Sequence, residues 1–452
     1  MQSFEDFNLS GQLKNAIDEL GFEAPTPIQS ESFSVVLSGR DIVGIAQTGT
    51  GKTLAYSLPI LHQYKYSKEA HPRVLILVPT RELVLQIVKN LEDYTRYMST
   101  RVLGVYGGTN INTQKLAVAE GMDILVATPG RLYDLVISRA LQIKAVKKLI
   151  IDEVDVMLDL GFRPQLTNIF DLLPTKRQNI MYSATMTGEI DQLIDSFFTA
   201  PVRIAIAVSG TPLDNIAQSC YSVPNFYTKV NLLTHLLLGK KEFSKVLVFV
   251  SNKKTADRLF ESLEELYGSE TCVIHSNKSQ NYRIRSIEEF DEGKNRILIA
   301  TDVMARGLDL ENISHVINFD TPDFPENYMH RIGRTGRAEK EGKSILFFTE
   351  KEKEWKEAIE SLMNISIPQL RLPKEVEISK ELIAEERPKV VELYSTHHKS
   401  TPGDQDVTFH EKSAKNKKVN LGGPKKRKAP KYKKPKTRGD KGFRKGKKNR
   451  RR

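Results

Sequence analysis

Residues 46–53 read AQTGTGKT, and this stretch decides the fold. It follows an apolar run and precedes an apolar stretch of helical character, which is the context that a phosphate-binding loop requires. Gly49 and Gly51 let backbone N–H groups approach phosphate oxygens. Lys52 reaches the outer phosphates of a nucleotide, and Thr53 offers a hydroxyl to Mg²⁺. The stretch therefore predicts an α/β domain that binds a nucleotide.

The surrounding sequence alternates short apolar runs with amphipathic stretches. Buried strands separated by helices indicate a parallel sheet with right-handed crossovers. We expect a first α/β domain of this kind over residues 1–207. Its expected strands are Asp41–Ala46, Val74–Val78, Val102–Tyr106, Ile124–Ala127, Leu149–Ile151, Ile180–Tyr182 and Arg203–Ile206.

A second α/β pattern follows a break in periodicity. Residues 208–218 contain Gly and Pro, which predicts a linker. The next domain is expected over 219–370, with a helix at Lys254–Tyr267 and another at Tyr282–Phe290. Trp355 is expected to lie in a helix after the last strand and to be buried in the core of the domain. The expected strands are Val246–Val250, Cys272–His275, Ile297–Ala300, His315–Phe319 and Ser344–Phe348.

Charge is concentrated in a C-terminal extension, residues 371–452. From Lys399 to Arg452 there are 22 Lys and Arg against 4 Asp and Glu, a net charge of +18, while residues 1–398 carry a net charge of −6. A segment of this composition buries too little apolar surface to order itself. A basic tail on a mildly acidic body indicates a polyanionic partner such as nucleic acid, and a purely solubilising tail is the alternative.

The cysteine count, the N-terminus and the lengths of the apolar runs predict the cellular compartment. Two cysteines, Cys220 and Cys272, are too few for a disulfide framework and favour a reducing compartment. The acidic start MQSFEDF does not resemble a signal peptide, and no stretch approaches the ~18 apolar residues of a membrane span. We expect a cytoplasmic monomer or weak oligomer with no membrane partner. The sequence PKKRK at 424–428 leaves nuclear import open.

An acidic pair, Asp152 and Glu153, follows the apolar run at 149–151. Beside a phosphate-binding loop, the first carboxylate holds Mg²⁺ through water and the second polarises the attacking water. Such a pair also serves as a helix N-cap, but the loop favours the catalytic interpretation.

Residues 330–337 read HRIGRTGR, so Arg331, Arg334 and Arg337 recur every three residues. On a helix they fall near one face, and grouped arginines suit phosphate oxygens. An arginine finger is worth about 10³–10⁵ in rate. A solvated basic face is the alternative. With the phosphate-binding loop, the cluster predicts ATP hydrolysis in a cleft between two domains, with Lys52, Asp152, Glu153, Arg334 and Arg337 as the catalytic residues.

These motifs, in this order over residues 4–350, resemble the DEAD-box ATP-dependent RNA helicases. The resemblance implies two tandem RecA-like parallel-sheet domains followed by a disordered basic tail, with ATP and Mg²⁺ as cofactors. Thr53 and, through water, Asp152 are the implied Mg²⁺ ligands. Phe4 resembles the aromatic residue that stacks on adenine, and Gln29 the amide that bonds its edge. The implied ATP-binding residues are Phe4, Phe22, Gln29, Ala46, Gln47, Thr48, Gly49, Thr50, Gly51, Lys52, Thr53 and Asp309.

The resemblance also assigns the RNA side of the site. PTREL, GG and TPGR resemble the RNA-contacting motifs of the first domain, and QxxR and the motif that begins at Thr301 resemble those of the second. Ser183, Ala184 and Thr185 resemble the motif that couples hydrolysis to strand separation, and Arg331 supports the closed interface. The implied RNA contacts are Pro79, Thr80, Arg81, Gly107, Gly108, Thr128, Pro129, Gly130, Arg131, Gln280, Arg283 and Thr301.

One residue departs from the family pattern. The name-giving motif reads Asp-Glu-Val-Asp at 152–155, with Val154 where the family usually has Ala. Both carboxylates remain, so ATP hydrolysis is still expected, and the extra bulk must be accommodated by neighbouring side chains.

The expected function is therefore ATP-dependent unwinding or remodelling of structured or double-stranded RNA, with little dependence on sequence. Ribosomal precursors and ribonucleoproteins are partners of the kind that the family implies. Three alternatives stay open: an ATP-dependent RNA clamp without productive unwinding, a DNA helicase or translocase, and a P-loop enzyme that acts on a small metabolite.

Overall fold

The computed structural model describes residues 3–47, 49–206, 215–305, 310, 312–336 and 341–387, with the backbone alone at Val303. The chain divides into two compact units, residues 1–388 and 389–452. The second unit, which contains the basic tail, lies outside the described residues. Thr48, Asp309 and Arg337 lie outside them too, as does most of the expected linker.

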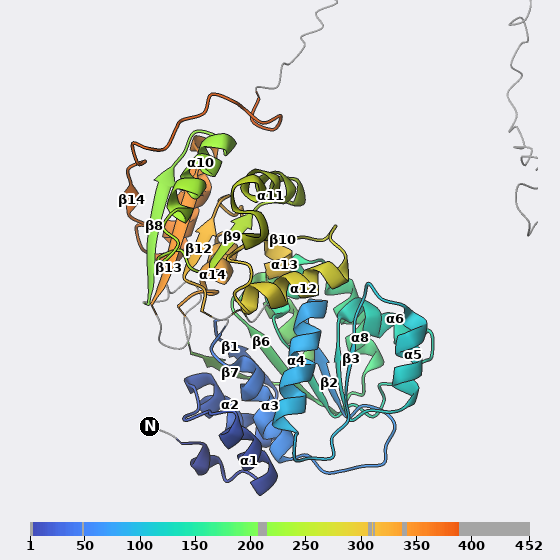
Figure 1. The fold of residues 1–452 in the computed structure, drawn as a ribbon. Coiled ribbons are helices and arrows are strands. Elements are labelled where there is room, and N and C mark those ends of the chain that lie inside the picture. Colours follow the sequence, from blue (N-terminus) through green and yellow to red (C-terminus); the bar gives the residue numbers. More distant parts are fainter. Residues whose placement is uncertain are drawn as a thin grey trace, which may run out of the picture. The chain divides into compact units, whose positions relative to one another are not determined.

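The first sheet contains every strand that the apolar runs of residues 1–207 predict. It is parallel, with the order β3-β4-β2-β5-β6-β1-β7 (Figure 1). The register pairs Ile42 with Ile180 and with Val202, so β1 lies between β6 and β7. The strands are β1 (Ile42–Ile45), β2 (Val74–Leu77), β3 (Val102–Val105), β4 (Ile124–Ala127), β5 (Lys148–Ile151), β6 (Gln178–Ser183) and β7 (Val202–Ala205).

Apolar cores cover both faces of this sheet. Buried residues of α1 to α4 form one cluster with β1 and its neighbours. Residues of α5 to α9 form the other, which includes Val154 at 0% exposure. The helices are η1 (Phe4–Phe7), α1 (Gly11–Glu19), α2 (Pro27–Leu37), α3 (Lys52–His62), α4 (Arg81–Tyr94), α5 (Ile111–Ala119), α6 (Pro129–Ile137), α7 (Val154–Asp159), α8 (Arg163–Leu172) and α9 (Gly188–Phe197).

The second sheet repeats the topology of the first. Its order is β10-β11-β9-β12-β13-β8-β14, and numbering each sheet from its own first strand gives the same order for both. All of its pairings are parallel. The strands are β8 (Ile216–Ser222), β9 (Val246–Val250), β10 (Thr271–Ile274), β11 (Ile297–Thr301), β12 (His315–Asn318), β13 (Gly342–Phe348) and β14 (Gln369–Leu370).

Three apolar clusters surround the second sheet. Residues of α10 and α11 belong to one, those of α12 and α13 to another, and those of α14 and α15 to the third. Among the described residues, no helix has the length and apolar character needed to span a membrane. The helices are α10 (Phe226–Leu237), α11 (Lys253–Tyr267), η2 (Gly268–Glu270), α12 (Gln280–Asp291), α13 (Asp302–Ala305), α14 (Pro325–Ile332), η3 (Glu350–Glu352) and α15 (Lys353–Met363).

The structure corrects the expected boundaries of the second domain. β8 begins at Ile216, inside the expected linker 208–218, because it pairs with β13 over its full length. The domain also continues past 370. Val376 is buried in its core, and Asn225 donates to the carbonyl of Ser379 at 2.6 Å. Trp355 lies on α15 as expected, but it is 38% exposed and not a core residue.

The parallel arrangement explains why distant motifs are grouped. In a parallel sheet, all carboxyl ends lie along one edge, which is where ligands bind in open α/β folds. The phosphate-binding loop follows β1, and the acidic pair follows β5. In the second sheet, Gln280 begins the helix after β10, and Arg331 lies on the helix after β12. Each motif therefore lies at the carboxyl edge of its own sheet.

Candidate ATP-hydrolysis site

The phosphate-binding loop is held in place by its glycines and by Gln29. Gly51 has φ +84° and is the N-cap of α3. The side-chain amide of Gln29 donates to the carbonyl of Gly51 at 3.2 Å and accepts from the N–H of Thr26 at 2.9 Å. A Cβ at Gly51 would lie 2.3 Å from the amide nitrogen of Gln29. Position 51 therefore requires glycine for its backbone conformation and for space.

Lys52 begins α3 with a buried side chain, at 7% exposure. Its ammonium group has no hydrogen-bond partner among the described residues. Burial raises the pKa of Asp152 and of Glu153, and the electrostatic attraction of Lys52 opposes that rise in both carboxyl groups. A buried ammonium without a hydrogen-bond acceptor at a helix N-terminus is suited to an anionic ligand.

Asp152 lies directly after β5 and is 4% exposed. Tyr56 donates its hydroxyl hydrogen to Oδ2 of Asp152 at 3.2 Å. Thr53 lies close enough to the same hydroxyl to oppose the rise in the pKa of Tyr56 that burial causes. Burial raises the pKa of Asp152, and Lys52 opposes that rise. Tyr56 thus brings Thr53 and Asp152, the two expected Mg²⁺ ligands, close to each other.

Glu153 has an unusual backbone conformation. Its φ of 53° and ψ of 49° lie in the left-handed region, which is costly for a residue with a Cβ and is found preferentially at functional sites. It occupies the N-cap position of α7 but makes no capping hydrogen bond, so the N-cap interpretation does not explain it. Its Oε2 atom is buried without a partner among the described residues. Burial raises the pKa of Glu153, while Arg334 and Lys52 lower it.

These residues fit a magnesium nucleotide. Lys52 is a buried cation without a hydrogen-bond acceptor among the described residues, and Thr53 and Asp152 offer oxygen atoms on either side of the Tyr56 hydroxyl, as hard cations prefer. Glu153 has a free carboxylate oxygen of raised pKa, which is suited to accepting a proton.

Asp155 joins three sequence motifs. Its Oδ2 atom accepts hydrogen bonds from the backbone N–H groups of Ala184 and Thr185 and from the hydroxyl of Thr185, each at 3.1 Å. The Nε2 atom of His330 lies 3.5 Å from the same oxygen. Ser183, which ends β6, donates its hydroxyl hydrogen to the carbonyl of Thr185 at 2.6 Å. The expected coupling motif is therefore bonded to the acidic motif and lies beside HRIGRTGR.

Arg331 and Arg334 of HRIGRTGR do not share one helical face. Helix α14 ends at Ile332, so Arg334 lies in the turn that follows, because Gly333 caps the helix. Arg331 is 1% exposed and forms a two-pronged ion pair with Asp302, at 2.5 and 2.8 Å. Arg334 is also buried, and its Nε atom donates to the carbonyl of His330 at 3.3 Å. Arg334 interacts electrostatically with Glu153, whereas Arg331 is bound within its own domain.

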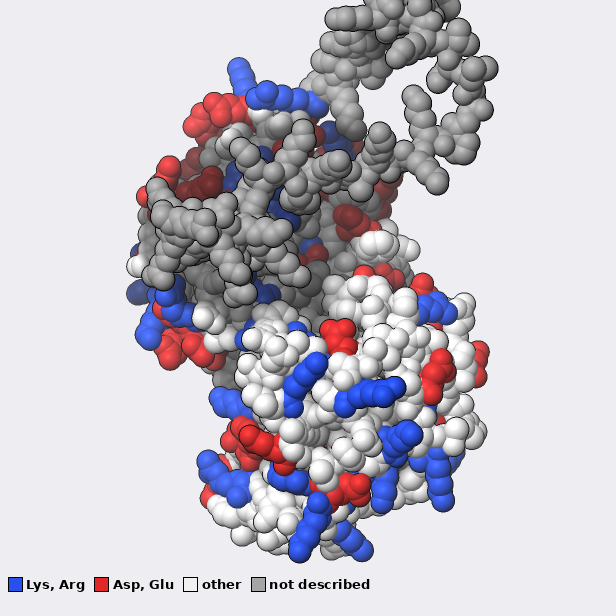
Figure 2. Space-filling model, turned by 90° about the vertical axis from the view of Figure 1, so that its right-hand side faces the viewer, with Lys and Arg blue, Asp and Glu red and all other residues white. Residues whose placement is uncertain are grey.

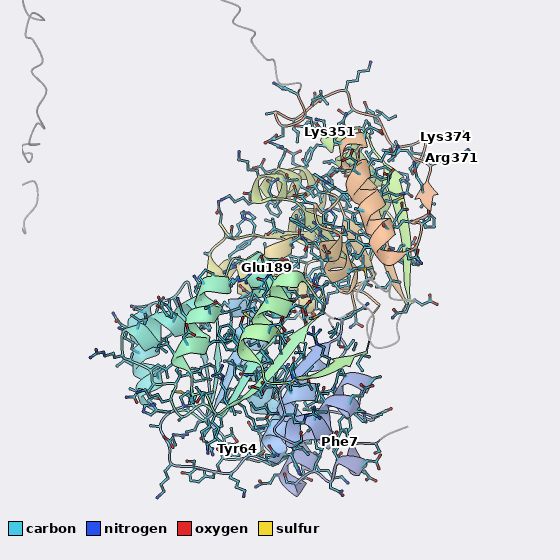
Figure 3. All side chains as sticks on the ribbon, turned by 180° about the vertical axis from the view of Figure 1, so that it is seen from behind. Phe7, Tyr64, Glu189, Lys351, Arg371 and Lys374 are labelled. Carbon is cyan, nitrogen blue, oxygen red and sulfur yellow. The ribbon has the colours of Figure 1, made fainter. Side chains whose placement is uncertain are left out.

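The expected adenine-reading residues lie in different surroundings. Phe4 is buried and packs edge-on against Phe7, which stacks on Phe33 of α2 (Figure 3 labels Phe7). Phe22 is 41% exposed. Gln29, on α2 with Phe33, is bonded to the phosphate-binding loop as described above.

The expected RNA-contacting motifs of the first domain are packed on one another. The guanidinium group of Arg81 lies 4.3 Å from the centre of the Tyr106 ring, next to Gly107 and Gly108. Arg131 is buried and donates to the Gln114 side chain at 2.8 Å and to the Thr109 carbonyl at 2.9 Å. These two hydrogen bonds hold the guanidinium group of Arg131 against residues that closely follow Gly107 and Gly108 in the chain. Thr80 of PTREL is the N-cap of α4, and Thr128 of TPGR is the N-cap of α6, so each helix begins inside its motif.

In the second domain, Gln280 and Arg283 both contact Glu82, the acidic residue of PTREL. Gln280 donates to its carboxylate at 3.0 Å, and a nitrogen of Arg283 lies 3.3 Å from the same oxygen. Thr301 ends β11 and lines a cavity of about 710 Å³ together with Asp155, Thr185, Asp302 and His330. Glu189, labelled in Figure 3 at the start of α9, lines it too.

Several residues of this site were not assigned roles from the sequence. Asp155 and His330 stand inside the quoted motifs, so their position in those motifs was an available signal. Glu82 stands within PTREL in the same way. Asp302 follows Thr301 in a quoted motif and carried that signal too. Tyr56 carries no comparable signal, because its role arises from a contact with Asp152 that only the fold brings about.

The fold and the site together define an ATP hydrolase built from two tandem RecA-like sheets. The family model of the DEAD/DEAH box helicase matches residues 26–193, and that of the helicase conserved C-terminal domain matches residues 228–339. The chain belongs to the DEAD-box family of ATP-dependent RNA helicases.

Sequence similarity to individual proteins supports the same family. The chain is 37% identical over 372 residues to the DEAD-box ATP-dependent RNA helicase CshA of Bacillus subtilis, covering 82% of this chain and 74% of CshA. It is also 37% identical to the ATP-dependent RNA helicase DeaD of Buchnera aphidicola, covering 84% of this chain but 62% of DeaD.

Solved structures show the same fold. S. cerevisiae Dbp5 bound to RNA and ADP BeF3 matches with a TM-score of 0.75 and 28% identity, over 82% of this chain and 96% of Dbp5. The DEAD-box helicase Mss116 bound to ssRNA and UDP-BeF matches with a TM-score of 0.75 and 26% identity, over 82% of this chain and 79% of Mss116.

Proposed function

We propose that this chain uses ATP hydrolysis in a cleft between its two RecA-like domains to unwind or remodel structured RNA locally. The observation that carries the proposal is a pair of buried charged groups with atoms that lack a hydrogen-bond partner among the described residues, namely the Lys52 ammonium and the Glu153 carboxylate, beside the buried guanidinium group of Arg334. We propose RNA as the substrate because the structures of the relatives Dbp5 and Mss116 were determined with RNA bound.

The residues divide the work as follows. Lys52 and the backbone of the phosphate-binding loop bind the phosphates, and Phe4, Phe22 and Gln29 read the adenine. Glu153 accepts a proton from the attacking water, and Arg334 with Arg337 neutralises charge on the γ-phosphate. Mg²⁺, when bound by Thr53 and Asp152, supplies further neutralisation of phosphate charge.

RNA lies on the motifs at the carboxyl edges of both sheets and is contacted through its sugar–phosphate backbone, which makes binding largely independent of sequence. Asp155 connects the hydrolysis site to Thr185 and His330, so closure around ATP is sensed by the motif that couples to RNA. ATP and RNA then favour each other's binding, and this coupling is reciprocal.

The first test is the steady-state rate of ATP hydrolysis with single-stranded RNA, double-stranded RNA and DNA of matched length. We expect strong stimulation by RNA and little by DNA. A hydrolysis rate that no polymer changes would contradict the proposal. Stimulation by DNA as strong as that by RNA would favour a DNA helicase or translocase.

A strand-displacement assay on a short RNA duplex separates unwinding from the alternative, an ATP-dependent RNA clamp. Release of the labelled strand at a rate that depends on ATP supports unwinding. RNA-stimulated hydrolysis with no strand release, together with slow dissociation of RNA in the presence of ATP, supports the clamp.

A further inference from the structure

A buried ammonium group lies in the second domain, away from the hydrolysis site. Lys229 on α10 is 3% exposed. Its Nζ atom lies 3.2 Å from Oδ1 of Asp320 and 2.9 Å from Oε2 of Glu352. The carboxylates outweigh the cost of burial and raise the pKa of Lys229, so the group is charged. The family motifs quoted above do not include this lysine.

The two carboxylates hold the backbone around the end of β12. Glu352 accepts hydrogen bonds from the N–H groups of Thr321, at 3.2 Å, and Thr349, at 2.7 Å. The other oxygen of Asp320 accepts from the N–H of Ser251 at 2.9 Å. Without a cation between them, the buried carboxylate of Glu352 and the half-buried carboxylate of Asp320 repel each other, and this arrangement is lost.

The backbone held in this way orients Arg331. The carbonyl of Asp320 accepts a hydrogen bond from Nη1 of Arg331 at 2.7 Å. The remaining partners of that guanidinium group are Asp302 and Asn318. Because Arg331 is fully buried, any shift of the carbonyl at 320 must move the arginine or leave a donor without a partner.

We propose that Lys229 is a positioning residue for the arginine motif: through Asp320 and Glu352 it fixes the carbonyl that orients Arg331, and with it the end of α14 from which Arg334 projects. The inference rests on the proposed role of Arg334 in hydrolysis. ATP binding is affected little, because the phosphate-binding loop and the adenine segment belong to the first domain. RNA-stimulated turnover is affected strongly, because it requires Arg334 at the γ-phosphate.

The test is Lys229→Met in the full chain. We expect kcat for RNA-stimulated ATP hydrolysis to fall roughly ten- to hundredfold, the range that a small misplacement of a catalytic group produces. The affinity for a fluorescent ATP analogue, measured by equilibrium titration, should be unchanged. The further substitution Glu352→Gln removes the surplus negative charge, so the double variant should recover part of the lost kcat.

Lys356→Met is the matched control. Lys356 pairs with Glu360 at 2.7 Å on α15 of the same domain, and that pair has no contact with Arg331. The Lys356→Met substitution should lower the Tm of the protein without lowering kcat per folded molecule. A folded Lys229→Met variant with wild-type kcat overturns the inference, as does an equal loss of ATP affinity.

If Lys229→Met does not fold, Asp320→Asn takes its place, because it leaves Lys229 paired with Glu352. The same selective fall in kcat is expected, and an unchanged kcat overturns the inference. The wild-type chain keeps the two hypotheses apart: absence of RNA stimulation in the wild type defeats the proposed function itself, whatever the variants do.

Discussion

Glu153 combines three costly features at one residue. It has a left-handed backbone, it is buried, and one of its carboxylate oxygens has no hydrogen-bond partner among the described residues. Each of these disfavours the folded state unless a ligand or a function compensates. The nearby Lys52 and Arg334 lower the pKa of the carboxyl group and thereby counter the effect of burial. A carboxylate whose pKa is raised by burial accepts a proton more readily than a solvated one, as a general base requires.

Replacing this carboxylate should separate binding from chemistry. We expect Glu153→Gln to bind ATP with wild-type affinity and to hydrolyse it about 10²–10⁴ times more slowly, because the amide cannot accept the proton. With ATP bound but uncleaved, RNA should dissociate more slowly than from the wild-type chain. Single-turnover hydrolysis and RNA dissociation in the presence of ATP measure the two effects.

Lys52→Ala is the contrasting variant, since it removes the phosphate-binding cation and should abolish ATP binding as well as turnover. Glu153→Gln with normal turnover would rule out the general-base role. Weakened ATP binding in that variant would instead assign Glu153 to ligand binding.

At the scale of elements, apolar runs predicted strands well where the strand is buried. Each expected run in the first domain is a strand. The five inner strands are almost entirely buried, because central strands of a parallel sheet are covered on both faces. β8 was missed because IAQSCYS has no such run, and its strand conformation comes from pairing with β13. The site was predicted through motifs. The contacts among Asp155, Thr185 and His330 were not, since they depend on how loops from separate strands meet.

One strand carries a half-buried charge that makes stability depend on pH. Lys148 begins β5 and donates to the Gln178 side chain at 2.6 Å. Burial lowers its pKa from 10.5 to about 8. Between these values the unfolded chain binds more protons than the folded chain, so this group adds to the free energy of unfolding as pH rises from about 8 to 10.5. Below pH 8 the folded state bears the full cost of the buried charge.

Lys148→Met should therefore remove this dependence. Relative to the wild-type chain, we expect the free energy of unfolding of the variant to fall by about 2 kcal/mol between pH 7 and pH 10, in urea unfolding experiments. The neighbouring Lys147→Met is the control, because Lys147 is exposed and its substitution should leave the difference from wild type constant. A constant difference for Lys148→Met as well would contradict the lowered pKa.

At the scale of the whole molecule, the two sheets share one strand order and each presents its motifs at its carboxyl edge. The described surface shows acidic and basic side chains interspersed (Figure 2), in keeping with the net charge of −6 over residues 1–398. If RNA binds at the motifs as proposed, this mixed surface positions its backbone but gives little long-range electrostatic attraction. We propose that the net charge of +18 over residues 399–452 supplies that attraction.

Removing the tail should therefore weaken RNA binding without harming the hydrolysis site. For a chain that ends at Thr396, we expect ATP turnover at saturating RNA to match that of the full chain. RNA affinity should fall, and the plot of log affinity against log salt concentration should become shallower, because fewer phosphates are neutralised on binding. Filter binding at several salt concentrations measures the slope. An unchanged slope would show that the tail does not contact RNA and would return it to a solubilising role, whereas lost turnover at saturating RNA would place part of the ATPase machinery beyond residue 396.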